Sequence, residues 1–349
     1  MIKKDCVSVI IPVYNRENMI GNAIESVLSQ SHSNLELMVI DDGSTDNTKD
    51  ILKSFDDDRI VLIETNHNGA YVARNIGIEN SRGEYLAFLD SDDVWLPGKL
   101  QKQVVVAKNN HVDFVFTNGY ILKESESGYR MYLAIKADSD RYRGKRYAEL
   151  LRQDFIATSS VMLKRNIIDD VGYFIAENRG VLDYEMWLRI ARKYEIDFMV
   201  EPLFLYKSHS NSLSGNRVAR LHDLLYVYNL QEKWCTQNGL KNERKIVRGS
   251  ISRTFMKLGL FYYNTRKGST ARKYFVKALT SRDIYLYSRI WSLACIVMPY
   301  PIYQRLYNYY VDLKLNLIRA LGGKITPKGA LKYMLLTFLH RIWHPKQKG

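Results

Sequence analysis

Residues 84–93 read Glu-Tyr-Leu-Ala-Phe-Leu-Asp-Ser-Asp-Asp, an apolar run that ends abruptly on three aspartates. The run is typical of a buried β-strand. Carboxylates are costly to bury without a partner, so several of them at the end of a strand either face solvent or hold a cation. Hard cations such as Mg²⁺ and Mn²⁺ take oxygen ligands. The stretch therefore predicts a strand that ends at a site for a cation and its phosphate.

A second acidic strand end lies upstream, where residues 35–40 run into Asp41-Asp42-Gly43-Ser44-Thr45-Asp46. Ligands of open α/β sheets bind beyond the carboxyl ends of the strands, so the two acidic ends could line one pocket. Each motif alone is also compatible with an ordinary turn, in which Asp and Ser bond their own backbone. The combination favours a shared pocket.

The first half of the chain alternates between strand-like and helix-like patterns, which is typical of βα units. The alternation predicts an α/β fold with a Rossmann-like, mainly parallel sheet. Residues 119–150 lose this order and are expected to form an irregular loop or short strands. The predicted strands are 7–14, 35–40, 60–64, 84–89, 112–117, 157–164 and 198–206, the last broken by Pro202, and the predicted helices are 18–29, 46–55, 70–80, 97–109 and 184–194.

Charge is distributed unevenly along the 349 residues. Residues 1–210 hold 26 basic and 32 acidic side chains, whereas residues 211–349 hold 25 basic and 5 acidic ones. This asymmetry predicts a folded body joined to a segment that meets polyanions, either nucleic acid or an anionic membrane surface. Three widely separated cysteines fit no disulfide framework, and no secretory signal is apparent, so a cytoplasmic protein is expected.

The segment after residue 213 is expected to be an all-α domain, with helices at 221–234, 246–263 and 269–279 and a polar hinge at 208–216 before them. Residues 284–303 are the most apolar stretch of this segment, but Arg289, Pro299 and Pro301 interrupt it. A helix that lies on a membrane surface is therefore favoured over a membrane span. A plain basic helical domain is the alternative.

Five motifs, in their order and spacing, resemble the family 2 glycosyltransferases of the GT-A fold. The resemblance covers about residues 5–213 and implies a catalytic domain over residues 1–213, followed by the helical region 214–349. The motifs are Val9-Ile10-Ile11-Pro12-Val13-Tyr14-Asn15, Asp41 to Asp46, Asn68-Gly69-Ala70 to Ala73-Arg74-Asn75-Ile76-Gly77-Ile78, Asp90-Ser91-Asp92-Asp93, and Asp183-Tyr184-Glu185 to Trp187-Leu188-Arg189.

The resemblance implies a nucleotide-binding site at the first, second and fourth motifs. Asp41 or Asp42 would accept the uracil N–H, and Asp90 would hold the ribose hydroxyls. Arg74 could reach the base or the diphosphate with its forked guanidinium, and a surface ion pair is its alternative role. The other residues assigned to the nucleotide are Pro12, Tyr14, Asn15 and Ser91.

The same resemblance implies a divalent cation, Mn²⁺ or Mg²⁺, held by Asp92 between the two phosphates. In an extended chain Asp90 and Asp92 would share one face. The cation would neutralise charge on the leaving nucleoside diphosphate. His209 follows Leu205-Tyr206-Lys207-Ser208 in a stretch that resembles the closing motif of the family, and it could approach the metal. A structural histidine is the alternative.

Asp183, at the start of a predicted helix, is expected to be the general base. The family pattern is Glu-Asp, but Leu182 takes the Glu position, which removes a neighbouring carboxylate. Glu185 is the second choice for the base, and a helix N-cap is the alternative role of Asp183. Trp187 and Arg189 could meet the acceptor sugar, although a helix core and an exposed face are alternatives.

Together these features predict an inverting, metal-dependent transfer of a sugar from a nucleotide donor, a UDP-sugar, to a glycan acceptor linked to polyprenyl diphosphate. The product would enter a surface polysaccharide such as a capsule or O-antigen, and the basic tail would hold the enzyme at the inner face of the membrane. One alternative is transfer to a polyprenyl phosphate. Another is a non-catalytic protein that binds a nucleotide and RNA or membrane, but no nucleic-acid motif is present, so no nucleic-acid partner is expected.

Overall fold

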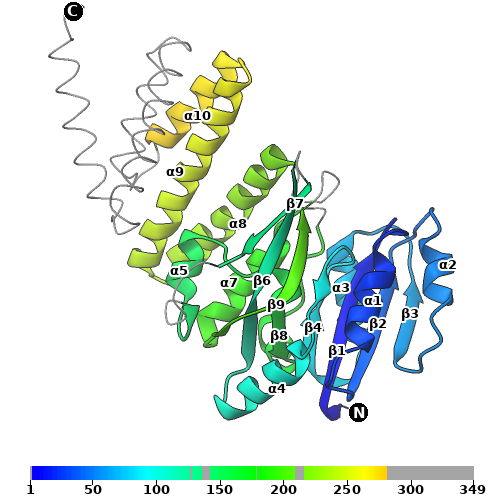
Figure 1. The fold of residues 1–349 in the computed structure, drawn as a ribbon. Helices are drawn as coiled ribbons and strands as arrows, with labels where there is room; N and C mark the ends of the chain where they lie inside the picture. The colour runs from blue at the N-terminus through cyan, green and yellow to red at the C-terminus, as the bar shows by residue number, and fades with distance from the viewer. Residues whose placement is uncertain (1, 126–127, 136–141, 178, 209–215, 281–349) are drawn as a thin grey trace, which may run out of the picture. The chain divides into compact units, whose positions relative to one another are not determined.

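The computed structural model describes residues 2–125, 128–135, 142–177, 179–208 and 216–280 (Figure 1). They form one nine-stranded sheet with helices on both of its faces, followed by longer helices. The strands are β1 (Lys3–Val13), β2 (Leu35–Asp41), β3 (Ile60–Glu64), β4 (Gly83–Phe88), β5 (Val94–Trp95), β6 (Phe114–Ser125), β7 (Gly128–Leu133), β8 (Val161–Lys164) and β9 (Asp197–Ser208). The helices are α1 (Ile20–Leu28), α2 (Thr48–Lys53), α3 (Ala70–Asn80), α4 (Lys99–Asn109), α5 (Tyr147–Arg152), α6 (Asn166–Val171), α7 (Leu182–Lys193), α8 (Arg217–Gln237), α9 (Lys241–Asn264) and α10 (Gly268–Thr280), and η2 (Thr158–Ser160) is a 3₁₀ turn.

The strands are ordered β3-β2-β1-β4-β8-β6-β9-β5, and β7 pairs with β6. Strands β3, β2, β1 and β4 run parallel, so the predicted parallel sheet is confirmed for the first half of the chain. The second half is mixed, because β8 lies antiparallel between β4 and β6 while β9 runs parallel to β6. The parallel arrangement brings the carboxyl ends of β1, β2 and β4 to one edge.

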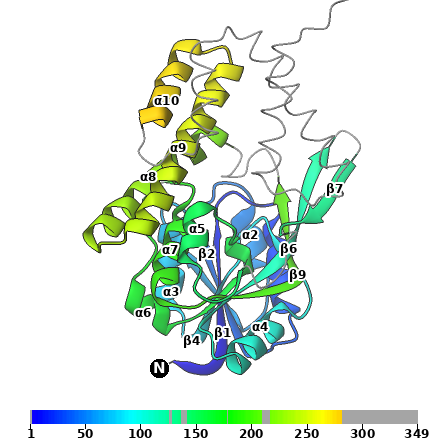
Figure 2. The ribbon, with the colours of Figure 1, turned by 90° about the vertical axis from the view of Figure 1, so that its left-hand side faces the viewer.

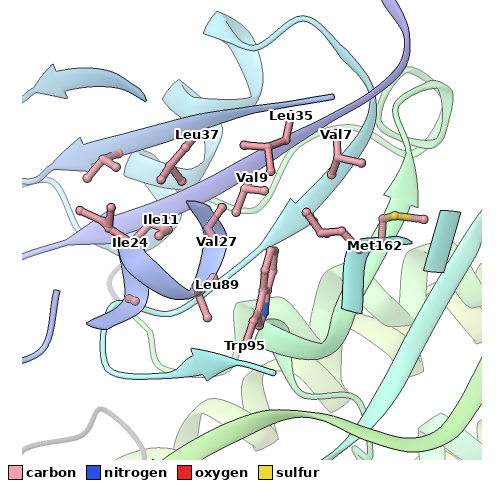
Figure 3. Close-up of a cluster of buried hydrophobic side chains, with 14 of the residues drawn as sticks. Val7, Val9, Ile11, Ile24, Val27, Leu35, Leu37, Leu89, Trp95 and Met162 are labelled. Atoms are coloured by element: carbon pink, nitrogen blue, oxygen red, sulfur yellow. The ribbon is translucent and has the colours of Figure 1, made fainter. Parts of the chain in front are cut away.

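Apolar side chains of β1 alternate between two helical layers. Val9 and Ile11 pack with Ile24 and Val27 of α1, in a cluster that continues to Trp95 (Figure 3). On the other face α3 approaches the sheet closely at Gly77, where a Cβ atom would lie 2.6 Å from Ile10 Cγ2. Two covered faces explain why these strands are almost continuously apolar.

Three predicted elements differ from the structure. Residues 119–150 are more ordered than expected, because β6 continues to Ser125 and forms a hairpin with β7 that projects beyond the rest of the sheet (Figures 1 and 2). All six residues of β7 are exposed, Tyr129 by 70%, so the strand lacks the alternation that signals a half-buried strand.

Strand β9 runs without a break through Pro202, because the register shifts opposite Asn118 absorb the proline. The predicted strand 157–164 begins instead as the turn η2, since the hydroxyl side chains of Thr158–Ser160 offer local and long-range hydrogen bonds that compete with a ladder.

The chain divides into two compact units, residues 1–251 and 252–349. In the second unit the end of α9 and α10 form a helical hairpin, in which Tyr263, Ala271 and Phe275 are buried together. Most of the predicted hinge at 208–216 lies outside the described residues, and so does all of the predicted membrane-surface helix at 284–303. The domain boundary after residue 213 stays a prediction. No helix in the described ranges is both long and apolar enough to cross a bilayer.

Candidate active site

The acidic loop, residues 90–93, leaves β4 at the edge where β1 and β2 also end. It turns back on itself, since Asp93 N donates a hydrogen bond to Asp90 O at 3.0 Å. The expectation of an extended chain is therefore wrong. Asp90 Oδ1 accepts a 2.5 Å hydrogen bond from Arg74 Nη2, and Asp92 Oδ2 lies 3.9 Å from Arg16 Nε. The loop thus presents carboxylates to guanidinium groups from two different elements.

Arg74 lies on α3 and is only 6% exposed, so its contact with Asp90 is not a surface ion pair. Burial disfavours its charge, but Asp90, Tyr71 and Asp183 outweigh this effect and raise the pKa of Arg74. Burial also raises the pKa of Asp90, against the lowering effect of Arg74. The Nε atom of Arg74 has no hydrogen-bond partner among the described residues, which leaves one buried donor for a ligand.

Asp93 is buried and anchors the acidic loop. Its Oδ2 accepts from Ser159 Oγ at 2.6 Å, and its Oδ1 accepts from Lys207 N at 3.3 Å. Ser159 Oγ also accepts from Asp90 N at 3.1 Å, and Ser159 O accepts from Trp95 Nε1 at 2.7 Å. Burial, reinforced by the neighbouring aspartates, raises the pKa of Asp93 well above its usual value. The loop is therefore fixed to both η2 and β9.

The other acidic strand end, Asp41 and Asp42 after β2, is built differently. Asp42 accepts from Asn68 N and Gly69 N, each at 2.8 Å, so it holds the loop that begins α3. Asp41 Oδ1 accepts from Ser44 N at 3.1 Å. Asp41 Oδ2 is buried without a hydrogen-bond partner in the described part of the chain. Of these two carboxylates, Asp41 is the one with an oxygen that accepts no hydrogen bond from the described residues, and Lys49 Nζ lies 3.9 Å from that oxygen.

The end of β1 forms the rim of the site. Pro12 is buried within the strand, whereas Tyr14 is 37% exposed and its ring lies 4.0 Å from the ring of His67 at an angle of 30°. Asn15 has a φ of 50° and its Oδ1 accepts from Thr45 N at 2.8 Å, which clamps the turn after β2 against β1. The two rings lie against each other, and Tyr14 stays partly exposed at the rim of the site.

Asp183 lies in the first turn of α7, one residue inside the helix. It does not cap the helix, because its oxygens accept from two side chains: Oδ1 from Tyr71 OH at 3.2 Å and Oδ2 from Thr158 Oγ1 at 2.6 Å. Its charge contributes to the raised pKa of Asp90, so both carboxylates face the same region. The positive end of α7 favours an anion here.

A further acidic residue, Asp154, interacts electrostatically with Asp183. Burial raises the pKa of Asp154 to about 7, and the charge of Asp183 adds to the shift while Arg220 opposes it. The family pattern has a Glu before Asp183, and Leu182 stands in its place here. Asp154, in the segment before η2, is a carboxyl group whose pKa responds to the charge of Asp183.

Contacts within the protein engage Trp187 and Arg189, which were expected at the acceptor, and Glu185, the second choice for the base. Trp187 is buried against the rings of Phe88, Phe114 and Phe174. Glu185 is also buried, and both its oxygens accept from Arg189 Nε, at 3.1 and 2.8 Å. Arg189 also donates to Tyr173 O at 2.8 Å. These contacts tie α7 to the preceding loop.

Sequence reasoning missed Tyr71, Thr158 and Ser159, which contact the predicted site residues directly. Tyr71 could have been found, because it precedes Arg74 by three positions on a predicted helix and therefore shares its face. The two hydroxyl residues gave no such signal, since they stood inside a segment that resembled a strand. Ser91 is buried within the acidic loop, and His209 lies outside the described residues.

The residues present fit a cation that arrives with a diphosphate. Within the described ranges no three His, Cys, Asp or Glu side chains form a cluster suited to a metal ion. Mg²⁺, however, is commonly held by one or two carboxylates while phosphates and waters complete its shell. Asp92, with Asp90 beside it, offers such hard oxygen ligands.

Residues 8–172 match the sequence model described as Glycosyl transferase family 2. The putative teichuronic acid biosynthesis glycosyltransferase TuaG of Bacillus subtilis is 35% identical over 254 residues, which cover 69% of this chain and 97% of TuaG. WfaP of Escherichia coli, named as a UDP-Glc:alpha-D-GlcNAc-diphosphoundecaprenol beta-1,3-glucosyltransferase, is 33% identical over 221 residues, which cover 62% of this chain and 83% of WfaP.

Solved structures are similar in fold. Residues 1–349 of TarS from S. aureus, in complex with UDP, superpose with a TM-score of 0.59 and 18% identity, covering 83% of this chain and 88% of that one. A longer TarS chain gives a TM-score of 0.57 at 17% identity, and this chain spans 54% of its length. At such identity the likeness concerns the fold alone, and it agrees with the predicted GT-A architecture.

Proposed function

Because the chain belongs to glycosyl transferase family 2 and is a glycosyltransferase, we propose that it moves a sugar from a uridine diphosphate sugar to a glycan carried on polyprenyl diphosphate. The observation that carries this proposal is a chain of contacts at the carboxyl ends of the parallel strands. Arg74 donates to Asp90 and lies over the ring of Tyr71, whose hydroxyl donates to Asp183. The name of WfaP supports the nucleotide and the acceptor, and a TarS structure with bound UDP supports the nucleotide.

In this proposal the nucleotide occupies the rim formed by β1 and β2. The exposed face of Tyr14, beside His67, stacks on the uracil ring. Asp41 Oδ2, which has Lys49 Nζ at 3.9 Å but accepts no hydrogen bond from the described residues, accepts the uracil N–H, which would satisfy a buried acceptor that otherwise costs free energy. Asp42 keeps its role as the anchor of the loop before α3.

The diphosphate lies beside the pair formed by Arg74 and Asp90, next to Asp92 of the acidic loop. Asp92, with Asp90 beside it, would hold Mn²⁺ or Mg²⁺ together with the phosphate oxygens, and His209 could approach from the segment after β9. When bound, the cation supplies Lewis-acid stabilisation of the leaving diphosphate. The unpartnered Nε of Arg74 offers a further donor to a phosphate oxygen.

Asp183 acts as the general base. Its carboxylate has about four lone-pair sites, of which Tyr71 and Thr158 occupy two, so a site remains for the acceptor hydroxyl. The hydroxyl proton passes to Asp183, the oxygen forms a bond to sugar C1, and the bond from C1 to the diphosphate oxygen breaks with its electron pair. A single displacement of this kind inverts the anomeric centre.

A titration of the full chain with UDP and several UDP-sugars, with Mn²⁺ and then with chelator, tests the donor part. We expect one uridine nucleotide to bind in a metal-dependent manner, and other nucleoside diphosphates to bind at least about tenfold more weakly. Release of UDP in the presence of a polyprenyl-diphosphate-linked sugar tests the acceptor part. Absence of binding to every nucleotide would contradict the proposal.

The acceptor class can be separated by one variant. A polyprenyl phosphate is already anionic and needs no base, so Asp183→Asn would keep its turnover with that acceptor and lose it with a sugar hydroxyl. A lipid-linked acceptor also places the enzyme at the inner face of the cell membrane, in the synthesis of a surface polysaccharide such as a capsule or O-antigen. Sedimentation with anionic vesicles tests that location.

A further inference from the structure

We infer that Thr158 and Ser159, two adjacent residues of η2, hold Asp183 and the acidic loop in a fixed arrangement, and that Tyr71 of α3 adds a second contact to Asp183. We call these three residues the brace. The inference rests on the proposed function, in which Asp183 is the base. Thr158, Ser159 and Tyr71 are positioning residues, because they contact the catalytic groups and not the substrate.

The first half of the brace acts on Asp183. Thr158 Oγ1 donates to Oδ2 at 2.6 Å and Tyr71 OH donates to Oδ1 at 3.2 Å, so each carboxylate oxygen is held by one hydroxyl. Tyr71 OH also accepts from Leu182 N at 2.9 Å, which ties the start of α7 to α3. Burial raises the pKa of Tyr71 well above its usual value, so the phenol stays a donor. The plane of the carboxylate is thereby fixed.

The second half of the brace acts on the acidic loop. Ser159 Oγ donates to Asp93 Oδ2 at 2.6 Å and accepts from Asp90 N at 3.1 Å. Its carbonyl oxygen accepts from Trp95 Nε1 at 2.7 Å, just beyond the loop. One serine thus contacts the first and last residues of the loop and the strand that follows it.

A purely local role for these hydroxyls is excluded by their partners. Ser160, in the same turn, bonds Ala157 O three positions away, as expected for a side chain that satisfies its own turn. Thr158 and Ser159 instead reach partners 25 and 66 positions away. Because their two α-carbons are about 3.8 Å apart, η2 sets the spacing between the base and the leaving-group site.

Thr158→Val and Thr158→Ser in the full-length enzyme test the brace, with Ser160→Ala as the control from the same turn. Turnover is measured with a UDP-sugar and a lipid-linked acceptor, and donor affinity by nucleotide titration. We expect Thr158→Val to lower kcat by about 10- to 100-fold, because small misplacements of a catalytic group have effects of this size. Donor affinity should change less than about threefold, and Thr158→Ser should recover most of the rate.

Tyr71→Phe gives an independent measurement, since it removes the donor to the other oxygen and should lower kcat with little change in donor affinity. Turnover of Thr158→Val within about twofold of the parent would overturn the brace. So would equal losses in Thr158→Val, Thr158→Ser and Ser160→Ala, which would indicate general damage to the turn. Asp183→Asn distinguishes failure of the brace from failure of the proposed function. If Asp183→Asn is inactive while Thr158→Val has normal turnover, Asp183 is the base but the brace is contradicted. Full activity in Asp183→Asn would contradict both.

Discussion

The two acidic strand ends, at 41–42 and 90–93, look alike in the sequence but have different surroundings. Asp42 accepts from two backbone N–H groups of the loop before α3. In the acidic loop, Asp90 faces the guanidinium of Arg74, and Asp92 lies near that of Arg16. A backbone donor cannot be released without unfolding its loop, whereas a guanidinium can be shared with a diphosphate. For Asp42 and Asp90, the type of partner therefore predicts which carboxylate anchors a loop and which meets a ligand.

Each strand end also contains one anchor. Asp93 holds the acidic loop to Ser159 and β9, as Asp42 holds the loop before α3. In the proposed function, Asp41, Asp90 and Asp92 are the carboxylates that meet ligands. Counting carboxylates in a motif overstates the size of a site, because a buried loop needs some of them for its own stability.

The largest expected effect is at Asp92. Asp92→Asn should lower turnover by about 1,000-fold or more, since it removes the charge that would hold the cation, while the melting temperature stays within a few degrees. Steady-state kinetics and thermal melting measure the two quantities, and Asp58→Asn, at an exposed position, is the matched control. Full activity in Asp92→Asn would remove the metal role.

Asp183→Asn should lower turnover with a sugar acceptor by about 100-fold or more, since the amide cannot take the proton. The affinity for the nucleotide should be preserved, because the contacts of Asp183 are with Tyr71 and Thr158. Loss of nucleotide binding in this variant would place Asp183 elsewhere in the mechanism.

Asp42→Asn should show the opposite pattern to Asp92→Asn. Asn68 N and Gly69 N donate to different oxygens of Asp42, and the amide of asparagine keeps only one oxygen that can accept. One backbone donor is therefore left unpaired, and the free energy of unfolding should fall by about 1–3 kcal/mol. Turnover per folded molecule should fall far less than in Asp92→Asn. Chemical unfolding measures the first effect. A stable but inactive Asp42→Asn would break the distinction between the two strand ends.

The smallest effect concerns Asp154, whose carboxylate accepts a hydrogen bond from Ile156 N at 3.3 Å and is influenced by the charge of Arg220. Its pKa is raised to about 7 in the folded protein, so the folded state binds the proton more tightly than the unfolded state, and stability falls as pH rises from about 4 through 7. Asp154→Asn should remove this loss of stability, because an amide does not titrate in this pH range. The variant should gain about 1.4 kcal/mol or more relative to the parent between pH 4.5 and pH 8, and a gain that is independent of pH would contradict the assignment.

The sequence alone predicted much of the fold, because apolar periodicity reports burial. Strand β3 and helix α3 begin and end where the pattern indicated, and the acidic loop lies where two strand ends meet. Periodicity says nothing about long-range partners. It could not tell Asp41 from Asp42, could not place Trp187 in the core instead of at an acceptor, and gave no reason to connect Thr158 with Asp183.

The contacts that complete the site join residues far apart in the chain. Tyr71 and Asp183 are 112 positions apart, and Asp93 and Lys207 are 114 apart. On a ribosome that adds about 5–20 residues per second, the acidic loop is made on the order of ten seconds before β9 can hold it. During that interval a nascent chain carries Asp93 without one of its two partners. The acidic loop therefore cannot be fully anchored before β9 is made, and a fragment that stops before residue 207 should bind nucleotide more weakly even where its sheet has formed.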